Sequence, residues 1–197
     1  MPYPLALNKS LTIRLSPRNL LAHCCALVAD EMSWKNVLRD VLERSLKRNG
    51  DLVFVGLGNP LRGDDGIGVK IAAKLSETLR HERIKILVVE ERVDLLPREL
   101  ERLKPAMILF FDAADFGGNP GEIRLMSLRE SAGKAISTHE IPLELIVKIS
   151  GISSPTYLLG VQVKSLEFGE QVSPPVKAAG EEVIRFLQET LSKYLLL

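Results

Sequence analysis

The sequence has 197 residues, of which 46% are hydrophobic and 26% are charged, and its formal net charge is +1. Such a composition is typical of a globular protein in water, and so small a net charge provides no field that would favour nucleic acid or an anionic membrane as a partner. No apolar run approaches the roughly 20 residues that span a bilayer. The two cysteines, Cys24 and Cys25, are adjacent, so they cannot provide a disulfide framework, and a reducing compartment is favoured.

The first segment, residues 1–32, has no regular hydrophobic pattern and is predicted to be an N-terminal extension. Its apolar patch at 20–28 follows basic residues, as in a secretory signal peptide, but the patch is short and His23 interrupts it. Translation from Met32 is another explanation. We therefore expect this extension to be dispensable and residues 33–197 to form a single α/β domain.

From Ser33 onward, hydrophobic periodicity predicts helices and strands along the whole chain. The predicted elements are a helix over 33–50, a strand over 52–56, a helix over 66–80, a strand over 84–89, a helix over 94–104, strands over 106–111 and 122–126, a helix over 140–150, a strand over 156–161 and a final helix from Ser173. Two prolines follow Ser173 and suit the first turn of that helix.

The strand patterns indicate how the sheet is built. The runs 52–56, 84–89 and 106–111 are almost entirely apolar, as in parallel strands that are buried on both faces. The run 122–126 alternates and follows a tight turn, so it should pair antiparallel, near an edge. The predicted fold is a three-layer α/β sandwich, with a twisted, mostly parallel five-stranded sheet, one antiparallel strand and helices on both faces.

Two adjacent acidic residues follow the first predicted strand, in the stretch "GLGNPLRGDDGIG" at residues 56–68. In open α/β sheets, ligands bind beyond the carboxyl ends of the strands, and Asp64 and Asp65 occupy such a position. One aspartate there can cap the following helix and stabilise it by about 0.5–2 kcal/mol. Because capping needs only one carboxylate, we interpret the other as functional.

A further acidic residue, Asp112, directly follows four apolar residues in "ILFFDAADFGGNPGEI", residues 108–123. A carboxylate there should be half-desolvated and should need a cation or a hydrogen-bond donor. A turn-forming role is an equal alternative for Asp112, and it is the better interpretation for Asp115, three residues later.

One histidine completes the candidate set. His139, in "STHEIPLELI" at residues 137–146, is predicted at the entry to a helix with an apolar face. A single histidine is more often structural than a ligand. However, two carboxylates at strand ends and one imidazole form an O,O,N set with open positions, which suits nickel, cobalt or zinc better than calcium or magnesium.

Together the three motifs resemble the nickel–iron hydrogenase maturation endopeptidases, in particular the type that serves the hydrogenase of formate hydrogenlyase and related membrane-bound complexes. The motifs occur in the family's order, and the stretch "YLLGVQVKSLEFGEQVSPPVKAA" continues the likeness, which covers roughly residues 51–190. The resemblance implies a peptidase that removes the C-terminal extension of a hydrogenase large-subunit precursor after nickel insertion. Cleavage would follow a basic residue, and the nickel would be carried by the precursor.

The resemblance also implies roles for individual residues. Asp65, Asp112 and His139 match the family's metal-contacting residues and would act in catalysis, as in an aspartyl-type peptidase, while Asp64 would be the helix cap. The enzyme would be a cytoplasmic monomer with the precursor as its partner, without nucleic acid or a membrane. The mechanism stays open: nickel could polarise the scissile carbonyl or activate water, or a carboxylate could act as the base.

Two other classes of protein share part of the pattern. Peptidyl-tRNA hydrolase also begins with "GLGNP", but its next tyrosine and its "RHN" segment are replaced here by "LRGDDGIG", and a net charge of +1 is poorly suited to binding tRNA. A nucleotide-binding α/β module needs G-x-G-x-x-G and an acid at the end of the second strand. The third glycine is missing, although Glu90 or Glu91 could supply the acid.

Overall fold

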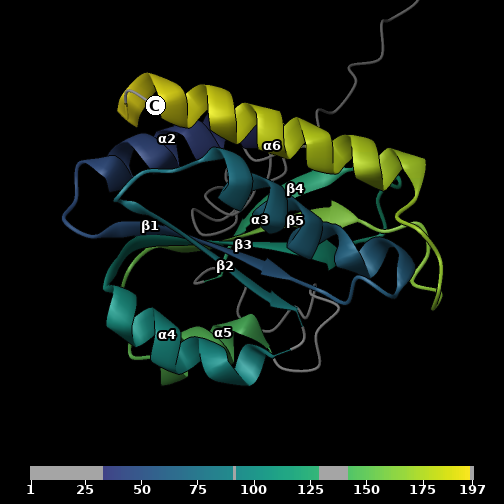
Figure 1. Cartoon of the computed structure of the whole chain (residues 1–197), viewed down its shortest axis with the longest axis horizontal. Coiled ribbons are helices and arrows are strands. Elements are labelled where there is room, and N and C mark those ends of the chain that lie inside the picture. The colour runs from purple at the N-terminus through teal and green to yellow at the C-terminus, as the bar shows by residue number, and fades with distance from the viewer. Residues whose placement is uncertain (1–32, 91, 129–141, 196–197) are drawn as a thin grey trace, which may run out of the picture. The chain divides into compact units, whose positions relative to one another are not determined.

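The computed structural model describes residues 33–90, 92–128 and 142–195, in which five strands form one sheet in the order β2-β1-β3-β5-β4 (Figure 1). The strands are β1 Asp51–Leu57, β2 Ile84–Glu90, β3 Pro105–Ala114, β4 Ile123–Ser127 and β5 Thr156–Gln162. All neighbouring pairs are parallel except β4 with β5, which are antiparallel and place β4 at an edge. The predicted sheet, with one antiparallel strand near an edge, is confirmed.

Helices cover both faces of the sheet and complete the predicted three layers (Figure 1). The helices of the described residues are α2 Trp34–Leu46, α3 Ile67–Thr78, α4 Leu96–Leu103, α5 Leu143–Ile149 and α6 Pro174–Leu195. One face packs against α2, α3 and α6, and the other against α4 and α5. Two short 3-10 turns, η1 Gly63–Gly66 and η2 Val93–Leu95, lead into α3 and α4. Within the described residues, no helix combines the length and the apolar character that a membrane crossing requires.

The central strand β3 is buried along all 10 of its residues. Its side chains alternate between two hydrophobic cores, so that Phe111 packs beneath α2, α3 and α6, whereas Phe110 packs beneath α4 and α5. Full burial of such a side chain contributes about 1.5–3 kcal/mol. The continuous apolar sequence of this strand therefore reflects burial on both faces, as predicted.

The strand β2 does not fit the same prediction. It pairs only with β1 and lies at an edge of the sheet. Most of its residues are only partly buried, and Val88 is 44% exposed. The prediction that 84–89 is buried on both faces was wrong because an edge strand can be as apolar as a central one. Strand order depends on pairing between distant segments, which local composition does not encode.

Close packing holds the start of α3 against the ends of two strands. A Cβ atom added at Gly68 would lie 2.2 Å from the carbonyl oxygen of Phe111 and 2.4 Å from that of Leu57. No side chain fits at this position, so only glycine lets α3 come so close to β1 and β3. As a result η1, immediately before α3, lies at the carboxyl ends of these two strands.

Candidate functional site

Two of the predicted site residues lie at the same edge of the sheet. Gly56 of β1 pairs with Phe111 of β3, so Asp112 is level with Leu57, the last residue of β1. The turn η1, which carries Asp65, contacts β3 directly. Both carboxylates thus lie where parallel α/β sheets bind their ligands.

Asp65 is held by the turn that follows β1. Its side chain is buried, at 7% exposure, and its Oδ2 accepts a hydrogen bond of 2.8 Å from the Asn59 backbone N–H. The turn requires glycine before Asn59: Gly58 has φ +118, and a Cβ atom there would lie 1.8 Å from the carbonyl oxygen of Asp65. The sequence "GLGN" therefore fixes where this carboxylate lies.

Asp112 is completely buried, at 0% exposure, rather than half-desolvated as predicted. The difference arises because β3 does not end at Asp112: it continues to Ala114, which pairs with Gln162 of β5. Side chains alternate along a strand, so Asp112 points to the same face as Phe110, the face covered by α4 and α5. A carboxylate at such a place needs a compensating charge or hydrogen bonds.

The third predicted residue, His139, lies outside the described residues. The described chain resumes at Pro142, and Leu143 of α5 packs in the core on the face to which Asp112 points. Within residues 33–90, 92–128 and 142–195, no three His, Cys, Asp or Glu side chains are grouped so as to hold a metal ion. The convergence of Asp65, Asp112 and His139 on one ion stays a prediction.

Asp64 does not cap the helix that follows it, and the predicted capping role was wrong. The N-cap of α3 is Gly66, without a side-chain hydrogen bond, because η1 separates Asp64 from the first turn. Instead the buried Asp64 carboxylate reaches the segment between β5 and α6. Its Oδ2 accepts hydrogen bonds from the N–H groups of Lys164 (2.7 Å) and Ser165 (3.0 Å). Its Oδ1 accepts one from the Ser173 N–H (2.6 Å), and the Ser173 hydroxyl donates to Oδ2 (3.0 Å).

These contacts determine the charge of Asp64. Burial alone would raise its pKa, but the hydrogen bonds from Ser173, Lys164 and Ser165 outweigh burial and lower the pKa below its ordinary value. The carboxylate is therefore ionised at neutral pH. It joins the loop after β1 to the loop after β5, across the end of the strand β3 between them.

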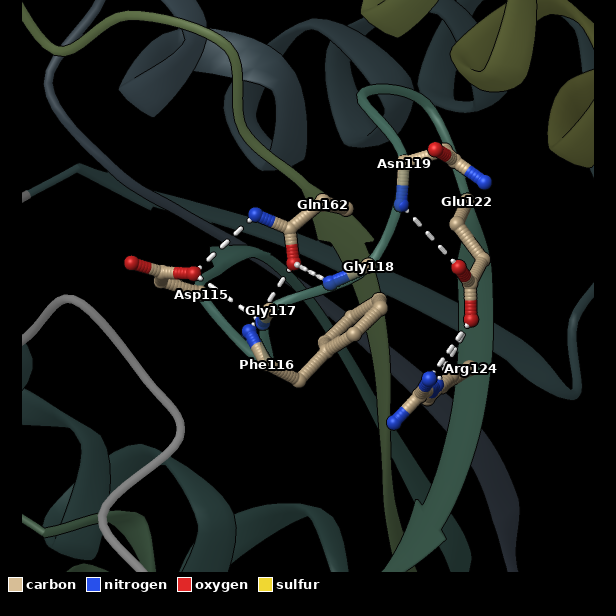
Figure 2. Close-up of polar contacts among 8 residues, drawn as sticks. All are labelled: Asp115, Phe116, Gly117, Gly118, Asn119, Glu122, Arg124 and Gln162. Atoms are coloured by element: carbon tan, nitrogen blue, oxygen red, sulfur yellow. Dashed lines mark hydrogen bonds and ion pairs between the residues drawn. The ribbon is translucent and has the colours of Figure 1, made fainter.

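Figure 2 shows a second polar network, which holds the loop that follows β3. The Gln162 side chain, 5% exposed, accepts hydrogen bonds through Oε1 from the N–H groups of Phe116 (2.9 Å) and Gly118 (3.1 Å). Its Nε2 donates to Asp115 Oδ1 (3.1 Å) and to the Val163 carbonyl oxygen (3.2 Å). One amide side chain thus fixes the segment three to six residues after Asp112.

Asp115 forms the turn that its sequence predicts. Its Oδ1 also accepts a hydrogen bond from the Gly117 N–H at 3.2 Å, and the hydrogen bonds from Gln162 and Gly117 lower its pKa. Farther along, Arg124 lies over the Phe116 ring, with 4.2 Å from the guanidinium carbon to the ring centroid, and pairs with Glu122 at 2.8 Å (Figure 2).

Sequence reasoning did not find the roles of Gln162 and Ser173. The only local signal for Gln162 is a polar residue at the end of the apolar run "TYLLGVQ". Ser173 was predicted only as the start of a helix. Both roles depend on segments that are far apart along the chain.

Three comparisons place this architecture among known proteins. Residues 72–190 match the family model described as hydrogenase maturation protease. The hydrogenase 3 maturation protease of Escherichia coli K12 is 31% identical over 140 residues, covering 69% of this chain and 88% of the relative. Among solved structures, a nickel–iron hydrogenase maturation protease from Thermococcus kodakarensis is 31% identical, with a TM-score of 0.67 over 77% of this chain and 99% of that one. An endopeptidase from E. coli is 27% identical, with a TM-score of 0.60 over 71% and 90%.

These matches agree with the motifs and do not favour a peptidyl-tRNA hydrolase or a nucleotide-binding module. The family model includes Asp112 and His139 and begins after Asp65, but the E. coli and T. kodakarensis proteins support the relationship over most of the chain. The chain belongs to the hydrogenase maturation protease family.

Proposed function

We propose that this protein is the endopeptidase that removes the C-terminal extension of a nickel–iron hydrogenase large-subunit precursor after nickel has been inserted. The observation that carries the proposal is the pair of buried carboxylates, Asp65 and Asp112, at the carboxyl edge of the sheet in a chain of the maturation protease family. Burying a carboxylate costs stability unless hydrogen bonds or a cation compensate it, so two acids buried at one edge of a sheet are unusual for a purely structural role. Their position is that of a ligand site.

In this proposal nickel belongs to the substrate. Asp65, Asp112 and His139 bind the nickel that the precursor carries, and carboxylate oxygens and an imidazole complete positions that the precursor's own ligands leave open. A precursor without nickel offers these residues nothing to bind. Binding at these three residues is therefore conditional on metal loading, and cleavage waits until the metal is in place.

The same three residues serve the cleavage step. Nickel supplies Lewis-acid chemistry at the scissile carbonyl or at a water molecule, and a carboxylate that is not protonated can accept the proton of the attacking water. The Asn59 N–H, which donates to Asp65 Oδ2 at 2.8 Å, holds that carboxylate in place at the carboxyl edge of the sheet. We propose Asp65, Asp112 and His139 as the catalytic residues on this basis.

The test is incubation with a purified, nickel-loaded precursor, followed by mass spectrometry of the precursor's C-terminus. The wild-type protein should release one C-terminal peptide. Asp65→Asn, Asp112→Asn and His139→Ala should each reduce cleavage by about 100-fold or more, as expected when a general base or metal contact is removed. Asp40→Asn, an exposed acid on α2, is the matched control and should retain full activity.

Two outcomes would contradict the assignment. Cleavage by His139→Ala at the wild-type rate would remove the histidine from the site. An experimental structure with His139 on the far side of the sheet from Asp112 would have the same consequence. We also propose that the protease acts as a cytoplasmic monomer, and sedimentation of the wild-type protein alone tests the oligomeric state.

A further inference from the structure

Two large apolar side chains are exposed on the loops around the candidate site. Leu61, in the loop after β1, is 61% exposed, and Phe168, in the loop after β5, is 74% exposed. The Gly169 N–H donates to the Leu61 carbonyl oxygen at 2.8 Å, so the two loops are in direct contact. We refer to Leu61 and Phe168 as the Leu61–Phe168 patch.

The backbone beneath the patch is held by hydrogen bonds on both sides. The Asp64 N–H donates to the Ser165 carbonyl oxygen at 3.0 Å, in addition to the bonds that the Asp64 carboxylate accepts. The Ser165 hydroxyl donates to Glu170 at 2.6 Å and accepts from the Glu167 N–H at 3.2 Å. Apolar side chains that are exposed to water on a fixed backbone do not stabilise the isolated protein. Such pre-organisation lowers the cost of binding a partner.

The patch is continuous with the acidic site. The Leu61 N–H donates to Asn59 Oδ1 at 2.8 Å, and the Asn59 N–H donates to Asp65 Oδ2 at 2.8 Å. Two hydrogen bonds through one residue therefore connect Leu61 to a proposed metal-contacting carboxylate. Any polypeptide that brings its cleavage segment to Asp65 meets this rim of the site.

The charges near the patch do not favour a charged partner. Arg62 follows Leu61 in the sequence, and Lys164 lies in the loop after β5 that also carries Phe168. The positive charges of these two residues are balanced by the negative charges of Glu167 and Glu170 in the same loop. These four formal charges cancel, and the ionised Asp64 carboxylate that joins the two loops adds a negative charge. Nucleic acid or an anionic lipid surface therefore finds no net attraction here, and the exposed apolar area is what distinguishes the rim.

We propose that the Leu61–Phe168 patch docks apolar side chains of the hydrogenase large-subunit precursor beside its cleavage segment. The proposal rests on the proposed function and adds a contact that selects the precursor independently of its nickel. The occupant is a polypeptide because proteases of this family act on proteins. An apolar contact at the rim supplies affinity without a metal, whereas the acids supply the dependence on metal.

The test compares Leu61→Ser, Phe168→Ser and the double variant with the wild-type protein. With the nickel-loaded precursor as substrate, KM should rise about fivefold or more in each single variant and about 30-fold in the double variant, as for central apolar contacts in interfaces. The kcat should stay within about twofold, because the contact is made equally before and during the reaction. Titration of nickel-free precursor should show binding weakened by similar factors.

Ile149→Ser is the matched control. Ile149 is 63% exposed, but it ends α5 shortly before β5 begins, so it lies toward the amino edge of the sheet. This variant should leave KM and kcat unchanged. All variants should melt within about 2 °C of the wild-type protein, because exposed side chains contribute little to folding stability.

The outcomes separate this proposal from the proposed function. If the wild-type protein cleaves the precursor and the double variant has the same KM, the docking surface is wrong and the function stands. If the wild-type protein does not cleave the precursor, the proposed function fails. If sedimentation shows a wild-type dimer that the double variant cannot form, the patch is a contact between copies of this chain and the docking proposal is overturned.

Discussion

Replacing Asp64 with asparagine tests the carboxylate that joins the loops after β1 and β5. Asparagine keeps one carbonyl oxygen, which can take the place of Oδ2 and serve Lys164, Ser165 and the Ser173 hydroxyl. Its NH2 group must then take the place of Oδ1, which accepts a hydrogen bond from the Ser173 N–H at 2.6 Å. Two donors face each other in a buried place, with no acceptor between them.

The expected loss of stability follows from these contacts. An unsatisfied buried donor costs about 1–3 kcal/mol, and loss of charge from the remaining hydrogen bonds costs about 1 kcal/mol more. A neutral amide is less costly to bury than a carboxylate, which offsets part of this loss. We expect Asp64→Asn to lower the free energy of unfolding by about 2–3 kcal/mol and the Tm by roughly 5–10 °C.

The pH dependence of this difference has a definite sign. The folded-state pKa of Asp64 is lowered from its ordinary value of 3.8. The carboxylate therefore contributes its full stabilisation above about pH 4 and loses it as the pH falls through the folded-state pKa. The difference in unfolding free energy between wild type and Asp64→Asn should be constant from pH 7 to pH 5 and should shrink below pH 4.

Denaturant unfolding at pH 7, 5 and 3.5 measures this difference. Asp115→Asn is the control, because Asp115 is an exposed acid whose pKa is also lowered by hydrogen bonds, and its replacement should move the unfolding midpoint little. If Asp64→Asn is as stable as wild type at pH 7, or if the difference grows in acid, the reasoning is refuted. Cleavage by Asp64→Asn should follow its folded fraction, whereas Asp65→Asn should be folded and inactive.

Three further predictions concern substrate, loop and leader. A nickel-free precursor should be cleaved at least about 100-fold more slowly than a nickel-loaded one in the mass-spectrometric assay, and equal rates would refute recognition through the metal. Gln162→Glu should lower the free energy of unfolding by about 1–3 kcal/mol at pH 7, since it removes both donors of a buried side chain. Acid should reduce this loss of stability, because it protonates the new carboxylate. Equal denaturation midpoints of the variant and the wild type at pH 7 would contradict this prediction. A chain that starts at Met32 should melt within a degree or two of the full chain, and a drop beyond about 5 °C would show that the leader stabilises the fold.

The sheet was predictable because its signals are local. Apolar runs, alternation at 122–126 and glycines at the turns each occur within a few residues and follow from backbone geometry. The antiparallel edge position of β4 could be read from the short turn before it. The edge position of β2 could not, because it depends on which strands pair across the sheet rather than on the sequence of 84–89.

Part of the candidate site could be predicted because two of its motifs lie at the ends of predicted strands. The positions of Asp65 and Asp112 at one edge follow from the parallel sheet. The function of Asp64 did not follow, because a cap of the next helix and an anchor for a segment 100 residues away have the same local sequence. The complete burial of Asp112 did not follow either, because β3 continues beyond it to Ala114, which pairs with Gln162 of the distant strand β5.

The anchor at Asp64 has a consequence for the order in which the carboxyl edge of the sheet forms during synthesis. Its hydrogen-bond partners, residues 164–173, are translated about 100 residues after the turn that carries Asp65. Contacts between such distant segments close large loops and form late in folding. The strand β3 likewise lacks its neighbour β5 until that point. A nascent chain whose β5–α6 segment is still within the ribosome therefore carries Asp64 and Asp65 but lacks the contacts that hold their turn, so this edge of the sheet is complete only once β5 and α6 are in place.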